Sequence, residues 1–148
     1  MSPTILIVED HGTVRKSLRD WLETEFPQCD VVEAASGEEA IVVARARSPR
    51  VVVMDIGLPK MSGIEATRHI KATLPTAQVV ILTIHNDQAY RTDATVAGAS
   101  AFVPKSAMYT KLIPTLAALL SEQVESPSSC DLSFSKKGLD RVIKREIR

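Results

Sequence analysis

The sequence predicts an α/β fold built on a parallel sheet that has helices on both faces. Short apolar runs alternate along the chain with segments of helical period. The runs are almost continuously apolar, which is typical of parallel strands that are covered on both sides. We expect strands over residues 4–8, 31–34, 51–54, 79–82 and 101–103. The alternation of strand and helix favours right-handed crossovers within one layered domain.

The helical segments carry their own patterns. Ser36 with Glu39, and Ser62 with Glu65, form capping-box patterns that indicate two helix starts. Pro114 falls inside the last helical segment, so we expect a kink or a lost backbone hydrogen bond there. Apolar residues at helical spacing predict buried stripes on the first, fourth and fifth helices, namely Val14, Leu18, Trp21 and Leu22; Tyr90, Ala94 and Ala97; and Met108, Leu112, Leu116 and Leu119.

Composition excludes several classes of protein but indicates no partner. The 148 residues include 18 lysines and arginines and 18 aspartates and glutamates, so no bulk charge attracts nucleic acid or a membrane. The two cysteines match neither a disulfide framework nor a metal-binding spacing, which favours a reducing compartment. The sequence shows no signal peptide and no apolar run long enough to span a bilayer. We therefore expect a soluble, cytoplasmic protein without a membrane partner.

Polar side chains follow the predicted strands at their carboxyl ends, where parallel sheets bind ligands. Glu9 and Asp10 follow the first strand, Asp55 the third and Thr83 the fourth, and Lys105 comes just after the fifth. Each residue alone is more typical of a cap, a turn or a solvated loop, but the set at successive strand ends favours a site. Close carboxylates need a divalent cation, and hard oxygen ligands suit Mg²⁺. Asp55 is the candidate nucleophile of a covalent phosphoryl transfer, with Thr83 and Lys105 bonding the phosphoryl oxygens.

These residues resemble the receiver domain of two-component response regulators. Segments 5–11, 55–65, 82–83 and 98–105 look like the family's acidic pair, phosphorylation loop, switch threonine and aromatic–lysine motifs. The resemblance covers roughly residues 4–120, and the motifs occur in the family's order. It implies a flavodoxin-like (βα)5 fold, a doubly wound sandwich whose five-stranded parallel sheet has the order 2-1-3-4-5.

The resemblance also implies a chemical role for each residue of the site. Asp55 is the phosphoacceptor, and a sensor histidine kinase is the phosphodonor. Mg²⁺ is held by Glu9, Asp10, Asp55 and the backbone carbonyl of Gly57, while Lys105 neutralises the phosphoryl group. The acidic pair is Glu-Asp where Asp-Asp is common, and we expect the longer side chain to retain metal binding.

A switch is implied as well. Thr83 and Phe102 rearrange on phosphorylation and change the surface of the fourth helix, fifth strand and fifth helix, where a second receiver or an output partner binds. Phe102 has an alternative interpretation as a core residue that never moves. Ile84 replaces the family's usual small residue and is expected to narrow access to the site. His85 either orients water beside the phosphoryl group or is an exposed histidine without a role, and we favour the second. We expect His11 to bind no metal because no histidine or cysteine lies at ligand spacing.

The end of the chain is predicted to lie outside the receiver domain. We expect the domain over residues 1–120, a serine-rich linker over 121–135 and a short basic, helical tail over 136–148. Segments 102–107 and 25–27 resemble the receiver subgroup that precedes a LuxR/NarL-type helix-turn-helix output domain. The tail is either a basic amphipathic helix that docks on a partner or the cut end of a longer regulator, and we favour the second. Nucleic acid is then expected to bind only through an output domain outside this sequence.

Other functions were weighed against this hypothesis. A phosphatase of the haloacid dehalogenase class needs a second aspartate two residues after the nucleophile, where this chain has Gly57. A flavin carrier needs a hydroxyl-rich or glycine-rich phosphate loop after the first strand, and this sequence has no such loop there. We therefore expect no enzyme beyond self-phosphorylation and self-dephosphorylation, with transcription regulation as the output of the full-length protein. The alternatives are a stand-alone receiver that acts through protein contacts and a receiver-like module that works without phosphorylation.

Overall fold

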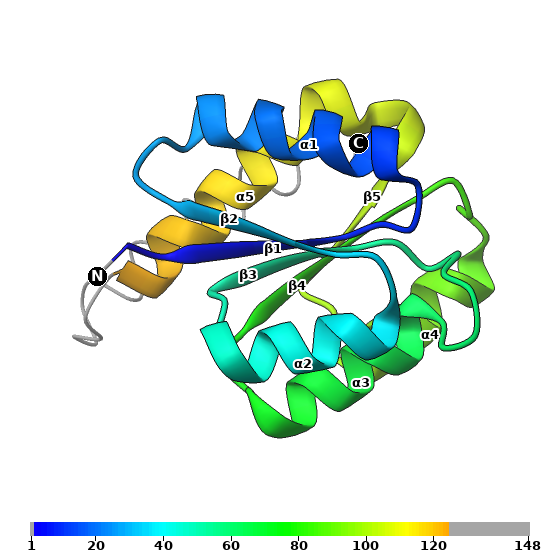
Figure 1. Ribbon diagram of the computed structural model, residues 1–148. Helices are drawn as coiled ribbons and strands as arrows, with labels where there is room; N and C mark the ends of the chain where they lie inside the picture. Colours follow the sequence, from blue (N-terminus) through cyan, green and yellow to red (C-terminus); the bar gives the residue numbers. More distant parts are fainter. Residues whose placement is uncertain (1, 125–148) are drawn as a thin grey trace, which may run out of the picture.

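A computed structural model describes residues 2–124, in which a central sheet lies between two layers of helices (Figure 1). Strands and helices alternate along the chain, as the sequence predicts. The elements are β1 (Thr4–Val8), α1 (Gly12–Glu25), β2 (Asp30–Ala34), α2 (Gly37–Arg47), β3 (Val51–Met54), α3 (Gly63–Thr73), β4 (Gln78–Thr83), α4 (Gln88–Ala97), β5 (Ala101–Pro104), the 3₁₀ turn η1 (Lys105–Ala107) and α5 (Met108–Val124).

The five strands are all parallel and lie in the order β2-β1-β3-β4-β5. This confirms the predicted doubly wound, flavodoxin-like sheet. From β1 the chain first adds β2 on one side and then crosses to β3 on the other, so the order reverses between β1 and β3. Parallel sheets of this kind bind ligands outside the carboxyl ends of their strands, at the point where the strand order reverses.

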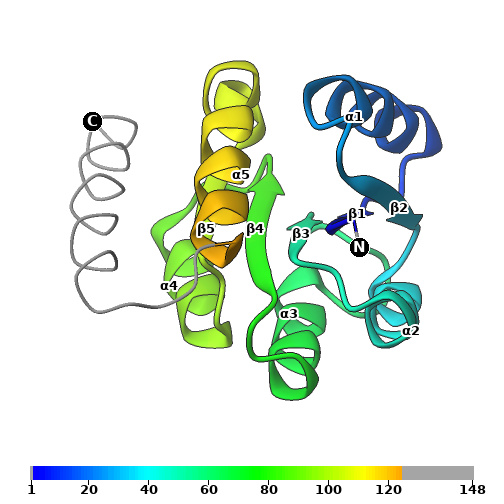
Figure 2. The ribbon, with the colours of Figure 1, turned by 90° about the vertical axis from the view of Figure 1, so that its left-hand side faces the viewer.

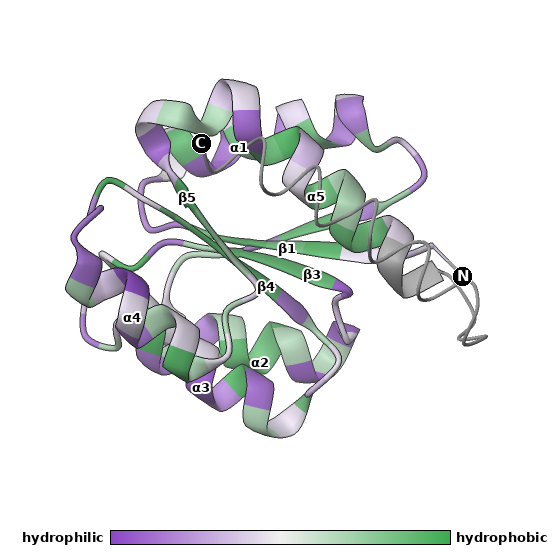
Figure 3. Ribbon diagram, turned by 180° about the vertical axis from the view of Figure 1, so that it is seen from behind, coloured by the Kyte–Doolittle hydropathy of each residue, from purple (hydrophilic) through white to green (hydrophobic). Residues whose placement is uncertain are grey.

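Both faces of the sheet are buried, and successive residues of a strand serve opposite cores. Helices α1 and α5 cover one face, and α2, α3 and α4 cover the other (Figures 1 and 2). In β1, Ile5 and Ile7 pack toward Leu18 and Leu22 of α1, whereas Leu6 lies in the core of the second face. The inner strands β1 and β3 are apolar apart from Thr4, whereas the edge strand β2 carries Asp30 and Glu33. Polar residues occupy the outer sides of the helices (Figure 3).

Two helix starts confirm the predicted hydroxyl caps. Ser36 Oγ accepts a hydrogen bond of 3.1 Å from the Glu39 N–H, and Ser62 Oγ accepts one of 3.2 Å from the Glu65 N–H. The Glu39 carboxylate accepts from the Ala35 N–H, one residue before the expected partner. Caps of this kind contribute about 1 kcal/mol each to stability.

Helices α1 and α5 differ from the predictions in detail. Val14 is 37% exposed, because it lies at the edge of the α1 stripe. Helix α5 continues through Pro114, which has no N–H to donate, and reaches Val124, four residues beyond the expected end of the domain at residue 120. The rest of the expected linker and the basic tail lie outside the described residues. Within residues 2–124, no helix combines the length and the apolar character that crossing a membrane requires.

Candidate functional site

The strand register brings Glu9 and Asp55 side by side. Val8 of β1 pairs with Met54 of β3, so the next residue of each strand is the first one past the sheet. The Asp55 N–H donates to the Val8 carbonyl at 3.1 Å, and the Glu9 N–H donates to the Ala34 carbonyl at 3.2 Å. These two backbone bonds extend the ladder by one residue and hold both acidic side chains at the switch point of the sheet.

Lys105 joins the two carboxylates. Its Nζ lies 2.7 Å from Glu9 Oε1 and 3.3 Å from Asp55 Oδ2. Glu9 is only 1% exposed and Asp55 8%, so both charges are removed from water and the pairing offsets part of that cost. The other oxygen of Asp55, Oδ1, accepts from the Gly57 N–H at 3.1 Å. Four of the predicted site residues therefore meet in one hydrogen-bonded cluster.

The ammonium of Lys105 is held in its charged form. Burial by itself lowers the pKa of Lys105, but the Glu9 hydrogen bond and the Asp55 carboxylate outweigh burial and leave the pKa above its ordinary value. A lysine with a raised pKa carries a full positive charge at neutral pH. It can therefore act as a fixed cation beside Asp55.

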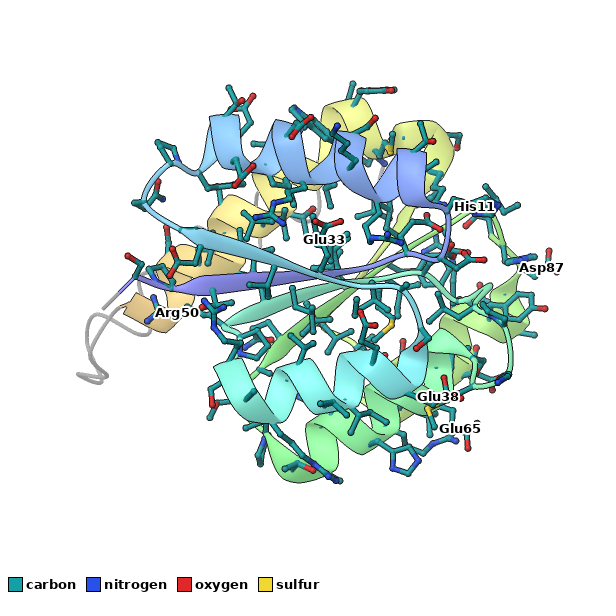
Figure 4. The ribbon with its side chains drawn as sticks, in the orientation of Figure 1. His11, Glu33, Glu38, Arg50, Glu65 and Asp87 are labelled. Atoms are coloured by element: carbon teal, nitrogen blue, oxygen red, sulfur yellow. The ribbon has the colours of Figure 1, made fainter. Side chains whose placement is uncertain are left out.

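Asp10 adds a carboxylate that lacks a donor. Its Oδ1 is buried and has no hydrogen-bond partner among the described residues. One ligand atom each from Glu9, Asp10 and His11 lies within 4.8 Å of the others. The His11 Nδ1 is 3.3 Å from Asp10 Oδ1, and its side chain is 73% exposed, at the sheet end where β1 leaves (Figure 4). A buried oxygen that accepts no hydrogen bond, beside further carboxylates, suits a hard cation such as Mg²⁺, so the residues fit the expected metal.

His11 is a neighbour of the site that the sequence analysis did not expect. The adjacency of a histidine to the acidic pair was visible in the sequence, but residue spacing gave no reason to place its ring near both carboxylates. The His11 N–H also donates to Glu9 Oε2 at 3.3 Å. His11 therefore helps to position the Glu9 carboxylate whether or not its ring binds a metal.

The Thr83 hydroxyl is fully buried, and it accepts from the His85 N–H at 3.2 Å. Its bond in the described structure thus leads into its own loop and not to Asp55. His85 is half-buried, which contradicts the expectation that it is exposed: a Cβ added to Gly57 would lie 3.2 Å from His85 Nε2, and the Tyr90 ring centroid is 5.3 Å away. Ile84 is 74% exposed, and the expectation that it narrows access to the site stays a prediction.

Phe102 lies on β5 and is only partly buried. It packs against the core that α2, α3 and α4 share, and the Arg91 guanidinium lies 4.7 Å from its ring centroid. Arg91 Nε also donates to Asn86 Oδ1 at 3.2 Å, in the loop that follows β4. Phe102 is therefore linked to α4 and to the loop after Thr83, whereas its contacts do not reach the acidic cluster.

Arg15 is the contributor that sequence reasoning missed most completely. Its NH1 donates to the Glu9 backbone carbonyl at 2.8 Å, while its Nε donates to Glu33 Oε1 at 2.9 Å. Its partners lie in the loop after β1 and on β2, so no local spacing pattern connects them to a residue of α1. The contact follows from the packing of α1 on the sheet.

Residues 5–117 match the family described as the response regulator receiver domain. The chain belongs to this family. The receiver domain is 36% identical over 102 residues to the transcriptional regulatory protein DegU of Brevibacillus brevis, which covers 68% of this chain and 43% of DegU. It is 32% identical over 136 residues to a putative transcriptional regulator of Pseudomonas aeruginosa, which covers 92% of this chain and 65% of that protein. The chain thus spans about half to two thirds of the length of these relatives.

Solved structures agree with this assignment. A two-component response regulator of the LuxR family from Aurantimonas sp. SI85-9A1 superposes with a TM-score of 0.76 at 33% identity, and the match covers 100% of both chains. The predicted resemblance to receivers of LuxR-type regulators is thereby confirmed at the level of the family and its neighbours.

Proposed function

We propose that the receiver domain accepts a phosphoryl group on Asp55 from a phosphohistidine of a sensor histidine kinase. The observation that carries the proposal is the Lys105 ammonium, which bridges Asp55 and Glu9 at the switch point of the sheet. A buried carboxylate beside a fixed cation is a nucleophile whose product, an acyl phosphate, is neutralised where it forms. The same cation would lie beside the added phosphoryl oxygens.

The transfer exchanges one bond of phosphorus for another. An oxygen of the Asp55 carboxylate attacks the phosphorus, the phosphorus–nitrogen bond to the histidine breaks, and the imidazole leaves with the electron pair of that bond. Lys105 stays beside the new phosphoryl group, and the Thr83 hydroxyl turns from the His85 N–H to donate to a phosphoryl oxygen. Water then hydrolyses the acyl phosphate, so the domain catalyses only its own phosphorylation and dephosphorylation.

Mg²⁺ would be held by the carboxylates of Glu9, Asp10 and Asp55 and by the Gly57 carbonyl. When bound, the cation supplies positive charge for the phosphoryl oxygens during transfer. The protein's own part is to hold the three carboxylates at one edge of the sheet and to leave Asp10 Oδ1 without a hydrogen-bond donor among the described residues. Oxygen ligands with little other bonding are what Mg²⁺ needs from a protein.

Phosphorylation would be transmitted to the surface of α4, β5 and α5. When Thr83 turns toward the phosphoryl group, the adjoining loop and Phe102 move with it, and the Arg91 stacking that joins Phe102 to Asn86 is rearranged. We infer that this surface then binds a second copy of the receiver or an output partner. The names of the relatives describe transcriptional regulators. We infer that the output is transcription regulation, through a helix-turn-helix domain of a full-length cytoplasmic protein.

Intact-mass spectrometry tests the proposal. The protein is incubated with acetyl phosphate and Mg²⁺, beside Asp55→Asn and the matched control Asp87→Asn, which makes the same chemical change at an exposed position before α4. We expect wild type and Asp87→Asn to gain one phosphoryl group, and Asp55→Asn or protein treated with a chelator to gain none. An adduct of equal yield on Asp55→Asn would show that Asp55 is not the acceptor.

A further inference from the structure

Arg15 connects the acidic pair to β2, the strand next to β1. Its guanidinium donates through NH1 to the Glu9 carbonyl and through Nε to the Glu33 carboxylate, so one planar group spans the loop after β1 and strand β2. We propose that Arg15 is a positioning residue for Glu9 and Asp10 and that it thereby sets the affinity of the site for Mg²⁺. The inference rests on the proposed function, because it concerns the same metal site.

The Glu9 carbonyl is an effective point at which to hold this loop. Strand β1 ends at Val8, so the Glu9 carbonyl lies past the last residue that the ladder pairs. The peptide bond that begins with this carbonyl continues to the nitrogen of Asp10 and is planar. A hydrogen bond of 2.8 Å from a charged donor therefore fixes the plane of the peptide that leads into Asp10. It thereby restricts the direction of the Asp10 carboxylate, whose Oδ1 accepts no hydrogen bond from the described residues.

Arg15 is itself held in place. Glu33 accepts from Arg15 at 2.9 Å and from Arg19 at 2.7 Å, and the Arg15 side chain is only 22% exposed. The hydrogen bond from Arg19, together with that from Arg15, keeps the pKa of Glu33 below its ordinary value. Glu33 lies between α1 and the sheet (Figure 4). The carboxylate is thus held in its charged form by two arginines, and it orients the guanidinium of Arg15 toward Glu9.

A positioning role and a purely electrostatic role of Arg15 predict opposite changes in Mg²⁺ affinity when Arg15 is replaced. Arg15 places a positive charge next to a site that binds a cation, so its removal would tighten Mg²⁺ binding if only charge mattered. Loss of the bond to the Glu9 carbonyl would instead loosen the acidic pair. Replacement of groups that orient metal ligands typically weakens metal binding about 10–100-fold. The sign of the change therefore distinguishes the two.

Arg19 offers a matched control. It lies one turn further along α1, carries the same charge and bonds the same Glu33, but its contacts are with Glu33 and Glu23 and not with Glu9. We would measure the Mg²⁺ dissociation constant by isothermal titration calorimetry for wild type, Arg15→Gln and Arg19→Gln. Urea unfolding of each variant would verify that the titrated protein is folded. We expect about tenfold weaker binding for Arg15→Gln and unchanged or slightly tighter binding for Arg19→Gln.

Other outcomes would overturn the inference. Equal or tighter Mg²⁺ binding by Arg15→Gln would leave Arg15 as a structural or electrostatic residue, and equal weakening in both variants would trace the effect to Glu33 alone. If Arg15→Gln fails to fold, Arg15→Lys tests the positioning role. Lysine keeps the charge but lacks the planar guanidinium that donates to Glu9 and Glu33 at the same time. We expect it to bind Mg²⁺ more weakly, and wild-type affinity would contradict positioning. A wild-type protein that binds no Mg²⁺ would contradict the proposed function itself.

Discussion

Glu9 is a carboxylate in a position where a charge is costly. At 1% exposure it has lost almost all of its water, and such a burial is tolerated only when the charge is paired and hydrogen-bonded. Lys105 supplies the ion pair, and the His11 N–H bonds the second oxygen. Glu9 is thereby held in a defined place without a metal, and the longer side chain at this position of the acidic pair is accommodated by its bond to Lys105.

The lowered pKa of Glu33 predicts that its contribution to the stability of the fold depends on pH. The hydrogen bond from Arg19 lowers the pKa of Glu33 most; burial opposes it, and the hydrogen bond from Arg15 and both guanidinium charges add to the lowering. A lowered pKa stabilises the fold fully above the ordinary value of 4.5, and that contribution is lost as the pH falls through the lowered pKa of the folded state. We expect Glu33→Gln to cost about 1 kcal/mol of unfolding free energy at neutral pH and progressively less toward about pH 3.

Urea unfolding of both proteins across this pH range measures the difference. Glu23→Gln is the control, because Glu23 is half-exposed and contacts Arg19 only at 3.6 Å. Its cost should stay below about 0.5 kcal/mol at every pH. A cost of Glu33→Gln that does not change between neutral and acidic pH would contradict the role given to its charge.

At the scale of elements, the joint between β3 and α3 determines where Asp55 sits. The Gly63 N–H, at the start of α3, donates to the Ile56 carbonyl at 3.1 Å, so the loop after Asp55 folds back onto the helix. Lys60 in this loop has a positive φ of 64°, a conformation that costs a non-glycine residue some strain. A Cβ on Gly63 would lie 1.9 Å from the Asp55 carbonyl oxygen, which leaves no room for a side chain.

We therefore expect Gly63→Ala to displace the loop and to cost about 2–3 kcal/mol, because backbone atoms cannot move aside as a flexible side chain can. Chemical denaturation measures this cost, and the yield of phosphorylated protein should fall with it. Gly12→Ala is the control: its new Cβ would be 3.8 Å from the nearest atom, Arg15 NH2, and helix α1 should gain or keep its stability. A Gly63→Ala protein as stable as wild type would refute the tight packing of this joint.

At the scale of the whole molecule, the sequence predicted what depends on regular periods. Continuous apolar runs indicated strands that are buried on both faces. Polar residues after the first, third, fourth and fifth runs indicated the site, because parallel strands end at one edge of a sheet. The meeting of Glu9, Asp55 and Lys105 follows from that rule together with the register of Val8 against Met54. These features need only the order of elements along the chain.

Contacts made by the packing of one element on another were not predictable in this way. Arg15 reaches Glu33 because of how α1 lies over β2, and neither residue's position in the sequence indicates the other. His85 was expected to be exposed, but it turns toward Gly57 because the loop after β4 passes over the loop after β3. Such contacts depend on how the elements pack in three dimensions, and residue spacing along the sequence does not predict that packing.

Location of the modified atom tests the central claim most directly. Protein treated with acetyl phosphate and Mg²⁺ is reduced with borohydride, which converts an aspartyl phosphate into homoserine, and the peptides are then sequenced by mass spectrometry. The account predicts homoserine at position 55, and at that position only. Homoserine at another aspartate, such as Asp10, would contradict Asp55 as the phosphoacceptor. So would aspartate at position 55 after borohydride treatment of protein that had gained a phosphoryl group.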